Sequence, residues 1–266
     1  MNKSELLEKY TKSEDKLLIS KLLDKIETCK KRNIITNTEF LDLYQRNIVE
    51  KTLKTLKCNY VFFGGYNDAN RVMLVIYPEK LTLDMAKENY LNYMKVIRIE
   101  LPKSLKGTYK HKDYLSGIMK LGVKREKFGD ILVEENGADI VVSDDISEYI
   151  KENLLHLTRF GKAKIEILDI KNIRNAEIKK EEFKIIIQTL RLDSIVAQLV
   201  NTSRTKASEI IEDSRVFVNY ENELKNDKQI KEKDIIVIRG KGKYEIDKIE
   251  GNTRKNKQIV VVKKYI

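Results

Sequence analysis

"RLDSIVAQLVNTSRTKASEIIEDSRVFVNY", residues 191–220, decides how the last third of this 266-residue chain folds. It contains two short apolar stripes at helical spacing, and VFVNY after them reads as a strand. Two later runs, DIIVIRG and KQIVVVKKYI, predict further strands. We therefore expect two helices on a small sheet. The stripes are Leu192, Ile195, Val196 and Leu199, and then Ala207, Ile210 and Ile211.

The joint between the two predicted helices gathers basic and hydroxyl side chains. Arg191 begins the first helix, and Ser203 can cap the second. The amides and dipole at that N-terminus favour a phosphate beside Arg204, Thr205 and Lys206. Such donors read the shape of a sugar-phosphate backbone better than base identity. We interpret the joint as an RNA-binding groove.

The plain alternative is a solvated surface on which Arg191 pairs with Asp193 or Glu212, since exposed ion pairs contribute little. The groove interpretation requires the guanidinium groups to lie on one side and not to be locked into internal acid pairs.

A basic tail follows the helical pair. Its nine cations face only three acids, Glu245, Asp247 and Glu250, which gives a charge of +6 (nine minus three). Of the tail, Arg239, Lys241 and Lys243 join the predicted RNA-binding residues, together with Arg215 and Asn219 before it. The tail cations are Arg239, Lys241, Lys243, Lys248, Arg254, Lys255, Lys257, Lys263 and Lys264.

This stretch resembles the S4 RNA-binding domain of a ribosomal protein, several RNA-modifying enzymes and some tRNA synthetases. The chain departs from that pattern at Ser214 and Tyr220, where the family often has glycine, and these changes affect the turns. The matching residues are Arg191, Leu192, Asp193, Ser203, Arg204, Ala207, Val216, Val218 and Asn219.

Composition agrees with a polyanionic partner. The formal charge of +11 and a pI near 9.3 favour nucleic acid or an anionic membrane surface. A hydrophobic fraction of 41% with two prolines predicts packed cores. We expect a cytoplasmic protein without membrane insertion, because the sequence contains no long apolar run and no signal-like start. Cys29 and Cys58 lack metal-ligand or disulfide spacing, so we expect no metal and no cofactor.

The first part of the chain, residues 1–58, reads as an N-terminal helical unit. A helix is predicted within residues 6–30, with apolar residues along one side at Leu17, Leu18, Leu22, Leu23 and Ile26. Thr36 and Glu39 have the spacing of a capping box, which predicts the start of a second helix.

Residues 59–180 predict a central α+β domain, followed by an S4 (alpha-L-like) domain at 181–266. Strands are expected at 60–65 and 71–78, then at MKVIRIELP and KAKIEILDI, with helices interspersed. Asn136-Gly137 suits a tight hairpin turn, and Asp144 or Asp145 can cap the helix after it. The order is similar to an RNA-recognition (RRM-like) fold, although no aromatic RNA-stacking motif of the usual kind is present. The overall class is α+β.

A second resemblance covers nearly the whole chain. HKDYLSGIMKLGVKREKFGDILV, His111 to Val133, and FFGGYNDANRVMLVIYP are similar to YlmH-like bacterial S4-domain proteins. The resemblance implies binding to ribosomal RNA of the large subunit and a role in handling stalled peptidyl-tRNA. An association with cell division is also attached to the family.

Central-domain candidates have plain alternatives. Lys124, Arg125 and Lys127 are positioned to touch RNA or tRNA, or form an ordinary charged loop. His111 with Asp113 suggests a general base, but i, i+2 side chains point apart on a helix and no nucleophile stands nearby.

Two further features favour structure over function. The pair Gly64-Gly65 fits a tight turn better than a phosphate loop. The aromatic run Tyr60, Phe62, Phe63 fits burial in a sheet better than base stacking.

We therefore expect a non-enzymatic, monomeric RNA-binding factor in ribosome-associated quality control. Its expected partners are large-subunit ribosomal RNA and peptidyl-tRNA. The alternatives are an RNA-modifying enzyme of the pseudouridine synthase or rRNA methyltransferase type, delivered by S4, and a cell-division scaffold with a division-protein partner. The enzyme alternative needs a catalytic aspartate motif or a cofactor loop, and the central region contains neither in recognisable form.

Overall fold

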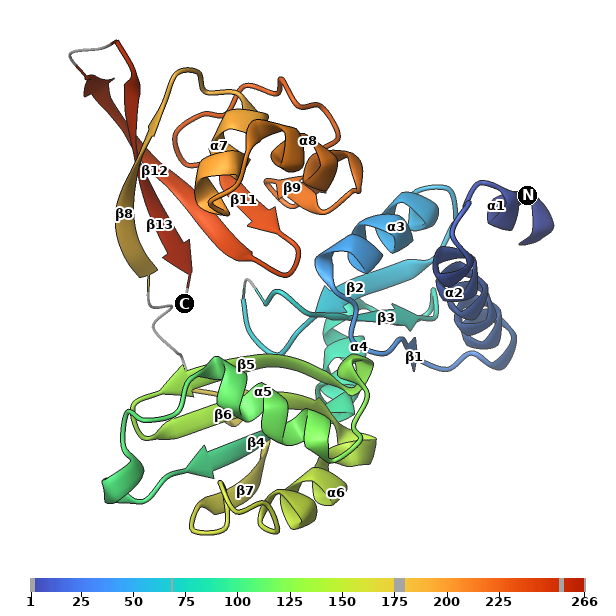
Figure 1. Ribbon diagram of the computed structural model, residues 1–266. Helices are drawn as coiled ribbons and strands as arrows, with labels where there is room; N and C mark the ends of the chain where they lie inside the picture. Colours follow the sequence, from blue (N-terminus) through green and yellow to red (C-terminus); the bar gives the residue numbers. More distant parts are fainter. Residues whose placement is uncertain (1–2, 68, 175–179, 254–255, 266) are drawn as a thin grey trace. The chain divides into compact units, whose positions relative to one another are not determined.

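The computed structural model describes residues 3–67, 69–174, 180–253 and 256–265 (Figure 1). Helices and antiparallel sheets alternate along the chain, which confirms the α+β class. The chain divides into two compact units, Met1–Ala176 and Glu177–Ile266. In the described residues, no helix combines the length and the apolarity needed to cross a bilayer.

The first unit begins with helices packed on a three-stranded sheet of order β1-β3-β2. Ile19 and Leu22 of α2 and Val49 of α3 pack against Leu74 and Ile76 of β3 in one apolar cluster. These contacts cross the domain boundary expected between residues 58 and 59. The elements are α1 (Lys3–Glu8), α2 (Ser13–Arg32), β1 (Thr36–Asn37), α3 (Leu43–Leu53), β2 (Asn59–Phe63) and β3 (Met73–Tyr77).

The helix start predicted at Thr36 and Glu39 is wrong. Thr36 lies in β1 opposite Ile76, and its hydroxyl donates to the carbonyl of Lys25 at 3.0 Å. The capping box lies six residues later, where Asp42 accepts from the Gln45 N–H and Gln45 accepts from the Asp42 N–H, both at 2.9 Å. Both sites have the right spacing, and pairing with β3 decides between them.

The strands predicted at 60–65 and 71–78 form an antiparallel pair, β2 with β3, and the RRM-like order of the second sheet is confirmed. That sheet runs β5-β6-β4-β7 and is built by a β-α-β-β-α-β segment, the ferredoxin-like arrangement. The elements are β4 (Met94–Glu100), α5 (His111–Lys120), β5 (Phe128–Glu134), β6 (Gly137–Ser143), α6 (Asp144–Leu154) and β7 (Lys164–Asp169). Short helices flank them at α4 (Leu83–Tyr90), η1 (Leu91–Tyr93), η2 (Lys103–Leu105), η3 (Arg125–Lys127) and η4 (Ile170–Asn172).

The hairpin predicted at Asn136-Gly137 is confirmed, with Glu134 paired to Gly137. Gly137 has φ 152°, and a Cβ there would lie 1.8 Å from the Ile99 carbonyl oxygen, so no larger residue fits. The helix cap predicted at Asp144 or Asp145 is one or two residues too late. Ser143 is the N-cap of α6, and both aspartates stand in the first turn, where their charge favours the helix dipole.

Side chains alternate between the two faces of the four-stranded sheet. Ile97 and Ile99 of β4 pack against Tyr114 and Ile118 of α5, together with residues of α6. Met94, Val96 and Val141 point to the opposite face, where they meet Phe40, Met73 and Ile170. Both faces of this half of the sheet are therefore covered.

Arg71 ties the two sheets of the first unit together. Its guanidinium donates to the carbonyls of Phe128 at 3.2 Å, Phe40 at 3.0 Å and Arg125 at 3.1 Å. Hydrogen bonds from a charged donor to several carbonyls stabilise loops more than hydrogen bonds from a neutral donor do.

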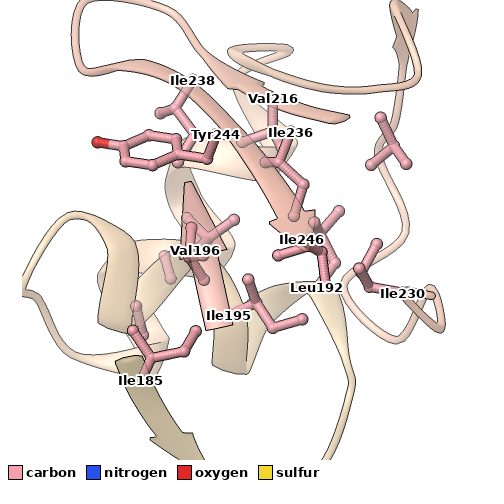
Figure 2. Packing of buried hydrophobic residues seen from close by; sticks show 14 of the residues in the cluster. Ile185, Leu192, Ile195, Val196, Val216, Ile230, Ile236, Ile238, Tyr244 and Ile246 are labelled. Atoms are coloured by element: carbon pink, nitrogen blue, oxygen red, sulfur yellow. The ribbon is translucent and has the colours of Figure 1, made fainter. Parts of the chain in front are cut away.

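The second unit is a six-stranded antiparallel sheet with α7 and α8 packed on it. Figure 2 shows Leu192, Ile195 and Val196 of α7 against Ile236 and Ile246 of the sheet. The sheet order is β10-β9-β11-β12-β13-β8. The elements are β8 (Lys180–Ile187), α7 (Leu192–Leu199), α8 (Arg204–Glu212), β9 (Val216–Val218), β10 (Glu221–Asn222), β11 (Ile235–Ile238), β12 (Gly242–Asn252) and β13 (Gln258–Tyr265).

Candidate nucleic-acid interface

The joint between α7 and α8 brings Arg191, Asp193 and Arg204 together. Arg191 is the N-cap residue of α7, and Arg204 is the first residue of α8. Arg191 Nη2 lies 3.0 Å and Arg204 Nη2 2.8 Å from the same oxygen, Asp193 Oδ2. The Ser194 N–H donates to Asp193 Oδ1 at 2.7 Å. One carboxylate, 4% exposed, thus orients both guanidinium groups.

The charge of this group does not cancel. Burial raises the pKa of Asp193, but hydrogen bonds from Arg191 and Arg204 outweigh burial and hold the pKa at about 2. The carboxylate is therefore ionised at neutral pH. Two guanidinium groups against one carboxylate leave a net charge of +1, and the Arg204 side chain is 56% exposed.

The structure contains features of both the groove interpretation and the ion-pair alternative. The two guanidinium groups lie on one side, as the groove interpretation requires, and the Arg191–Asp193 pair of the plain alternative is also confirmed. The requirement that neither arginine be locked into an internal acid pair is not met. A phosphate at this joint would have to share the guanidinium groups with Asp193.

The cap predicted at Ser203 is confirmed. Its hydroxyl accepts from the Lys206 N–H at 3.3 Å. Arg204, Thr205 and Lys206 are exposed in the first turn, while Ala207 is buried beneath them. The helix start therefore presents its donors to solvent.

Asn219 serves the turn after β9. Its carboxamide donates to Asp234 Oδ1 at 2.8 Å and accepts from the Ile235 N–H at 2.9 Å. Tyr220 follows with φ 67°, and Ser214 has φ 59°. Both residues that replace glycines of the S4 pattern adopt the left-handed conformation that glycine favours, so the turns keep their shape.

The remaining candidates near β9 and β12 differ in exposure. Arg215 Nη2 donates to the Arg239 carbonyl at 3.2 Å, while Arg239 and Lys241 are exposed at the start of the β11–β12 turn. Lys243 is only 8% exposed. Its ammonium lies 4.5 Å from the ring centroid of Tyr265, in addition to its contact with Tyr220, so it packs within the fold.

Two lysines of β8, which precedes the basic tail in sequence, neutralise two of the three acids in that tail. Lys180 pairs with Glu245 at 2.6 Å and Lys184 with Glu250 at 2.7 Å, both from β8. Within the tail, Lys263 pairs with Asp247 at 2.8 Å. Lys248 is exposed, Lys257 and Lys264 are half-buried, and Arg254 and Lys255 lie outside the described residues.

The three cations of the central domain that were predicted to touch RNA have different surroundings. Arg125 Nη1 donates to the Phe128 carbonyl at 2.7 Å and the Gly129 carbonyl at 3.1 Å. Burial and the adjacent Arg71 lower the pKa of Arg125 to about 10, so it stays charged at neutral pH. Lys127 bridges Glu39 and Asp145 at 2.8 and 2.7 Å. Lys124 is the member of this group that is exposed.

The general-base reading of His111 and Asp113 gains no geometric support. Asp113 accepts from the Lys110 N–H at 2.8 Å and pairs with Arg159 Nη1 at 3.2 Å, so its carboxylate caps α5.

Phe63 packs in the sheet region with its ring centroid 5.2 Å from that of Tyr90, and Gly65 has φ 97° in a bend.

Comparison with known proteins matches the central segment to a described family. Residues 87–174, the segment that contains the β5-β6-β4-β7 sheet, match the family described as "Putative RNA-binding domain in YlmH". The chain is similar to YlmH-like RNA-binding proteins in this segment and along most of its length. The resemblance seen in the sequence is thereby confirmed.

The chain is similar to two named proteins. It is 27% identical over 227 residues to "Ribosome-associated protein quality control protein P2" of Bacillus subtilis (strain 168), which covers 83% of each chain. It is also similar to the solved structure "Cell division protein ylmH from Streptococcus pneumoniae", with 18% identity and a TM-score of 0.49. That similarity covers 62% of this chain and 98% of the solved one.

One group of polar side chains in the matched segment does not follow from the sequence pattern. Lys120 of α5 and His156 and Arg159 of the loop after α6 line a common cavity. They lie about 36 residues apart in sequence, which hides their proximity. The density of lysine around α5 is the signal that points to this surface.

Proposed function

We propose that the chain is a non-enzymatic RNA-binding factor that docks on ribosomal RNA of the large subunit in ribosome-associated quality control of stalled translation. Peptidyl-tRNA is the proposed second contact. The relative from Bacillus subtilis, which carries ribosome-associated quality control in its name, supports this role. Ribosome binding also makes the cytoplasm the proposed site of action.

The observation that carries the proposal is the pair of guanidinium groups oriented by Asp193. Planar guanidinium groups suit phosphate oxygens because they offer parallel donors, and orientation in advance reduces the entropy lost on binding. Arg204 combines its own charge with the N-terminus of α8, where backbone N–H groups favour an anion. We assign the phosphate contacts to Arg191, Ser203, Arg204, Thr205 and Lys206.

The neighbouring candidates take two roles in this proposal. Arg239 and Lys241 extend the contact along the start of the β11–β12 turn, with Arg215 holding the Arg239 backbone. Asn219 and Lys243 support the interface from within the fold, because their polar groups already contact Asp234, Tyr220 and Tyr265.

The test is binding of the full chain to purified large ribosomal subunits, measured by co-sedimentation. Arg204→Ala keeps the Arg191–Asp193 pair and removes a mostly exposed guanidinium. Loss of a charged hydrogen bond predicts binding weakened roughly tenfold. Arg191→Ala combined with Arg204→Ala should abolish co-sedimentation.

Two controls separate binding from folding. Lys248→Ala removes an exposed cation of the same unit, on β12, that the proposal does not use and should leave binding unchanged. Arg204→Lys keeps the charge without the planar fork and should give an intermediate affinity. Normal thermal unfolding of Arg204→Ala together with unchanged co-sedimentation would place the RNA contact elsewhere.

A further inference from the structure

The four-stranded sheet of the central domain does not offer the usual RNA-binding face. RRM domains stack bases on aromatic side chains of the sheet surface. In this chain, half of the surface opposite α5 and α6 is covered, because Met94 and Val96 pack there against Phe40 and Met73. The residues of the two central strands that point to this face include no aromatic side chain.

An ion-pair network occupies the other half of that face. Arg98 and Asp139 lie opposite each other on β4 and β6 and form two hydrogen bonds, of 2.9 and 2.7 Å. Arg174 adds contacts to Glu100 at 3.1 Å and Glu134 at 3.3 Å. Two arginines against three carboxylates leave a net charge of −1. This surface therefore repels phosphate more than it attracts it.

The side of the domain formed by α5 has the opposite charge. From Lys103 to Lys127 the chain carries eight cations and two acids, a net charge of +6 (eight minus two), although Arg125 and Lys127 of this segment have partners within the fold. Four lysines on α5 or within four residues of its ends are exposed. They are Lys110, Lys112, Lys120 and Lys124.

A cavity of about 350 Å³ opens beside α5 and has donors of the kind that bind phosphate. Ser116 and Lys120 contribute from the helix, and His156, Thr158 and Arg159 from the loop after α6. Lys120, His156, Thr158 and Arg159 supply an ammonium, an imidazole, a hydroxyl and a guanidinium, all donors that phosphate oxygens accept. The Ser116 hydroxyl already donates to the Asp113 carbonyl at 3.1 Å.

Local contacts hold the cavity in shape. Arg159 Nη1 donates to Ser116 Oγ and to the Asp113 carbonyl, both at 3.0 Å, and Tyr109 donates to the Arg159 carbonyl at 2.9 Å. A Cβ on Gly117 would lie 2.4 Å from the Phe160 ring, so the helix and the loop approach as closely as glycine permits. The donors therefore need little rearrangement to receive a ligand.

We infer that the central domain contacts the RNA backbone through the surface of α5 and residues 155–163, with one phosphate in the cavity beside Lys120 and Arg159, and not through the sheet. This inference rests on the proposed RNA-binding function and names the face that the second domain uses. Its partner is the sugar-phosphate backbone of structured RNA.

Charge reversal on the two faces of the same domain tests the inference. In the full chain, Lys120→Glu alters the α5 surface, and Lys171→Glu in η4 makes the same charge change beside Ile170, which packs on the sheet face. The probe is purified large-subunit ribosomal RNA, with affinity measured over a series of salt concentrations. Lys120→Glu should weaken binding roughly tenfold and lower the slope of log K against log salt by about 1. Lys171→Glu should change neither.

The outcomes distinguish this inference from the proposed function. Unchanged affinity of Lys120→Glu, while Arg204→Ala still weakens binding, would overturn the α5 surface and leave the proposed function intact. Equal weakening by Lys120→Glu and Lys171→Glu would reduce the effect to net charge and overturn the inference. If Lys120→Glu binds naked RNA normally but fails to co-sediment with whole subunits, the surface belongs to a protein contact and the inference is wrong.

Discussion

Asp193 has a structural role that its charge alone does not suggest. It is buried, yet it accepts hydrogen bonds from Arg191, Arg204 and the Ser194 N–H. A buried carboxylate without partners would be costly, and two guanidinium groups offset that cost. The same contacts fix the direction in which both arginines point.

This arrangement predicts a pH-dependent loss of stability. The pKa of Asp193 falls from its ordinary 3.8 to about 2 in the folded protein, so its contribution is present above pH 4 and disappears as the pH falls towards 2. Because Arg191 and Arg204 are partly exposed, we expect about 1–2 kcal/mol from this group. Urea unfolding of the wild type should show this loss between pH 5 and pH 2.

Asp193→Asn provides the matched comparison for the acid titration. It lacks the titrating group, so its free energy of unfolding should be lower at neutral pH and should fall less on acidification. Parallel pH profiles of the two proteins would contradict the role given to Asp193.

Single cations were the hardest residues to place from sequence. Arg125, Lys127 and Lys243 have the type and the neighbourhood of RNA-binding residues. The fold instead gives Lys127 a carboxylate and Lys243 an aromatic ring that lie far away in sequence, and it turns Arg125 onto the carbonyls of Phe128 and Gly129. Exposure depends on those distant partners, which sequence spacing does not reveal.

At the scale of elements, the end of α8 carries a strained residue. Ser214 has φ 59°, and its N–H donates to the Ile211 carbonyl, while the Arg215 N–H donates to the Ile210 carbonyl. These two bonds form the Schellman motif, whose left-handed position is usually glycine. The S4 resemblance indicates glycine at the same position.

Ser214→Gly should therefore stabilise the protein. Removing the Cβ from a left-handed residue relieves about 1 kcal/mol, partly offset by the greater entropy of glycine in the unfolded chain. We expect a net gain of about 0.5 kcal/mol in urea unfolding. Ser208→Gly, inside α8, serves as the control and should cost roughly 0.5–1 kcal/mol. A destabilised Ser214→Gly would show that the serine side chain supports the turn.

Element prediction succeeded where apolar periodicity was strong and failed where charge interrupts it. The stripes of α7 and the hairpin β5–β6 followed from their patterns. The strand β12, GKYEIDKIEGN, was missed because charged residues occupy its outward positions and two register shifts break its alternation. Its pairing with β11 and β13 supplies what local propensity lacks.

At the scale of the molecule, the two units have separate hydrophobic cores. The C-terminal core draws all its buried residues from Ile185 to Val262. A segment with its own core can fold alone. The sheet order and the α5 surface needed three-dimensional contacts for their recognition, whereas the overall class and the two C-terminal helices packed on a sheet followed from pattern.

Expression of residues 180–266 alone should give a cooperatively unfolding domain that still binds large-subunit ribosomal RNA. If both units contact phosphates, the slope of log K against log salt should be smaller for this fragment than for the full chain, by about 0.7–0.9 per phosphate lost. Filter-binding titrations at several salt concentrations measure both slopes. Equal slopes would mean that residues 1–174 contact no phosphate.

Arg71 has a consequence for how the first unit opens. A single guanidinium joins the strand that follows Phe63 to carbonyls at Phe40, Arg125 and Phe128. Amide protons of β3 and β5 should therefore exchange with solvent in one concerted event, and not sheet by sheet. The hydrogen bonds of Arg71 therefore define the smallest part of the first unit that unfolds locally as one cooperative unit.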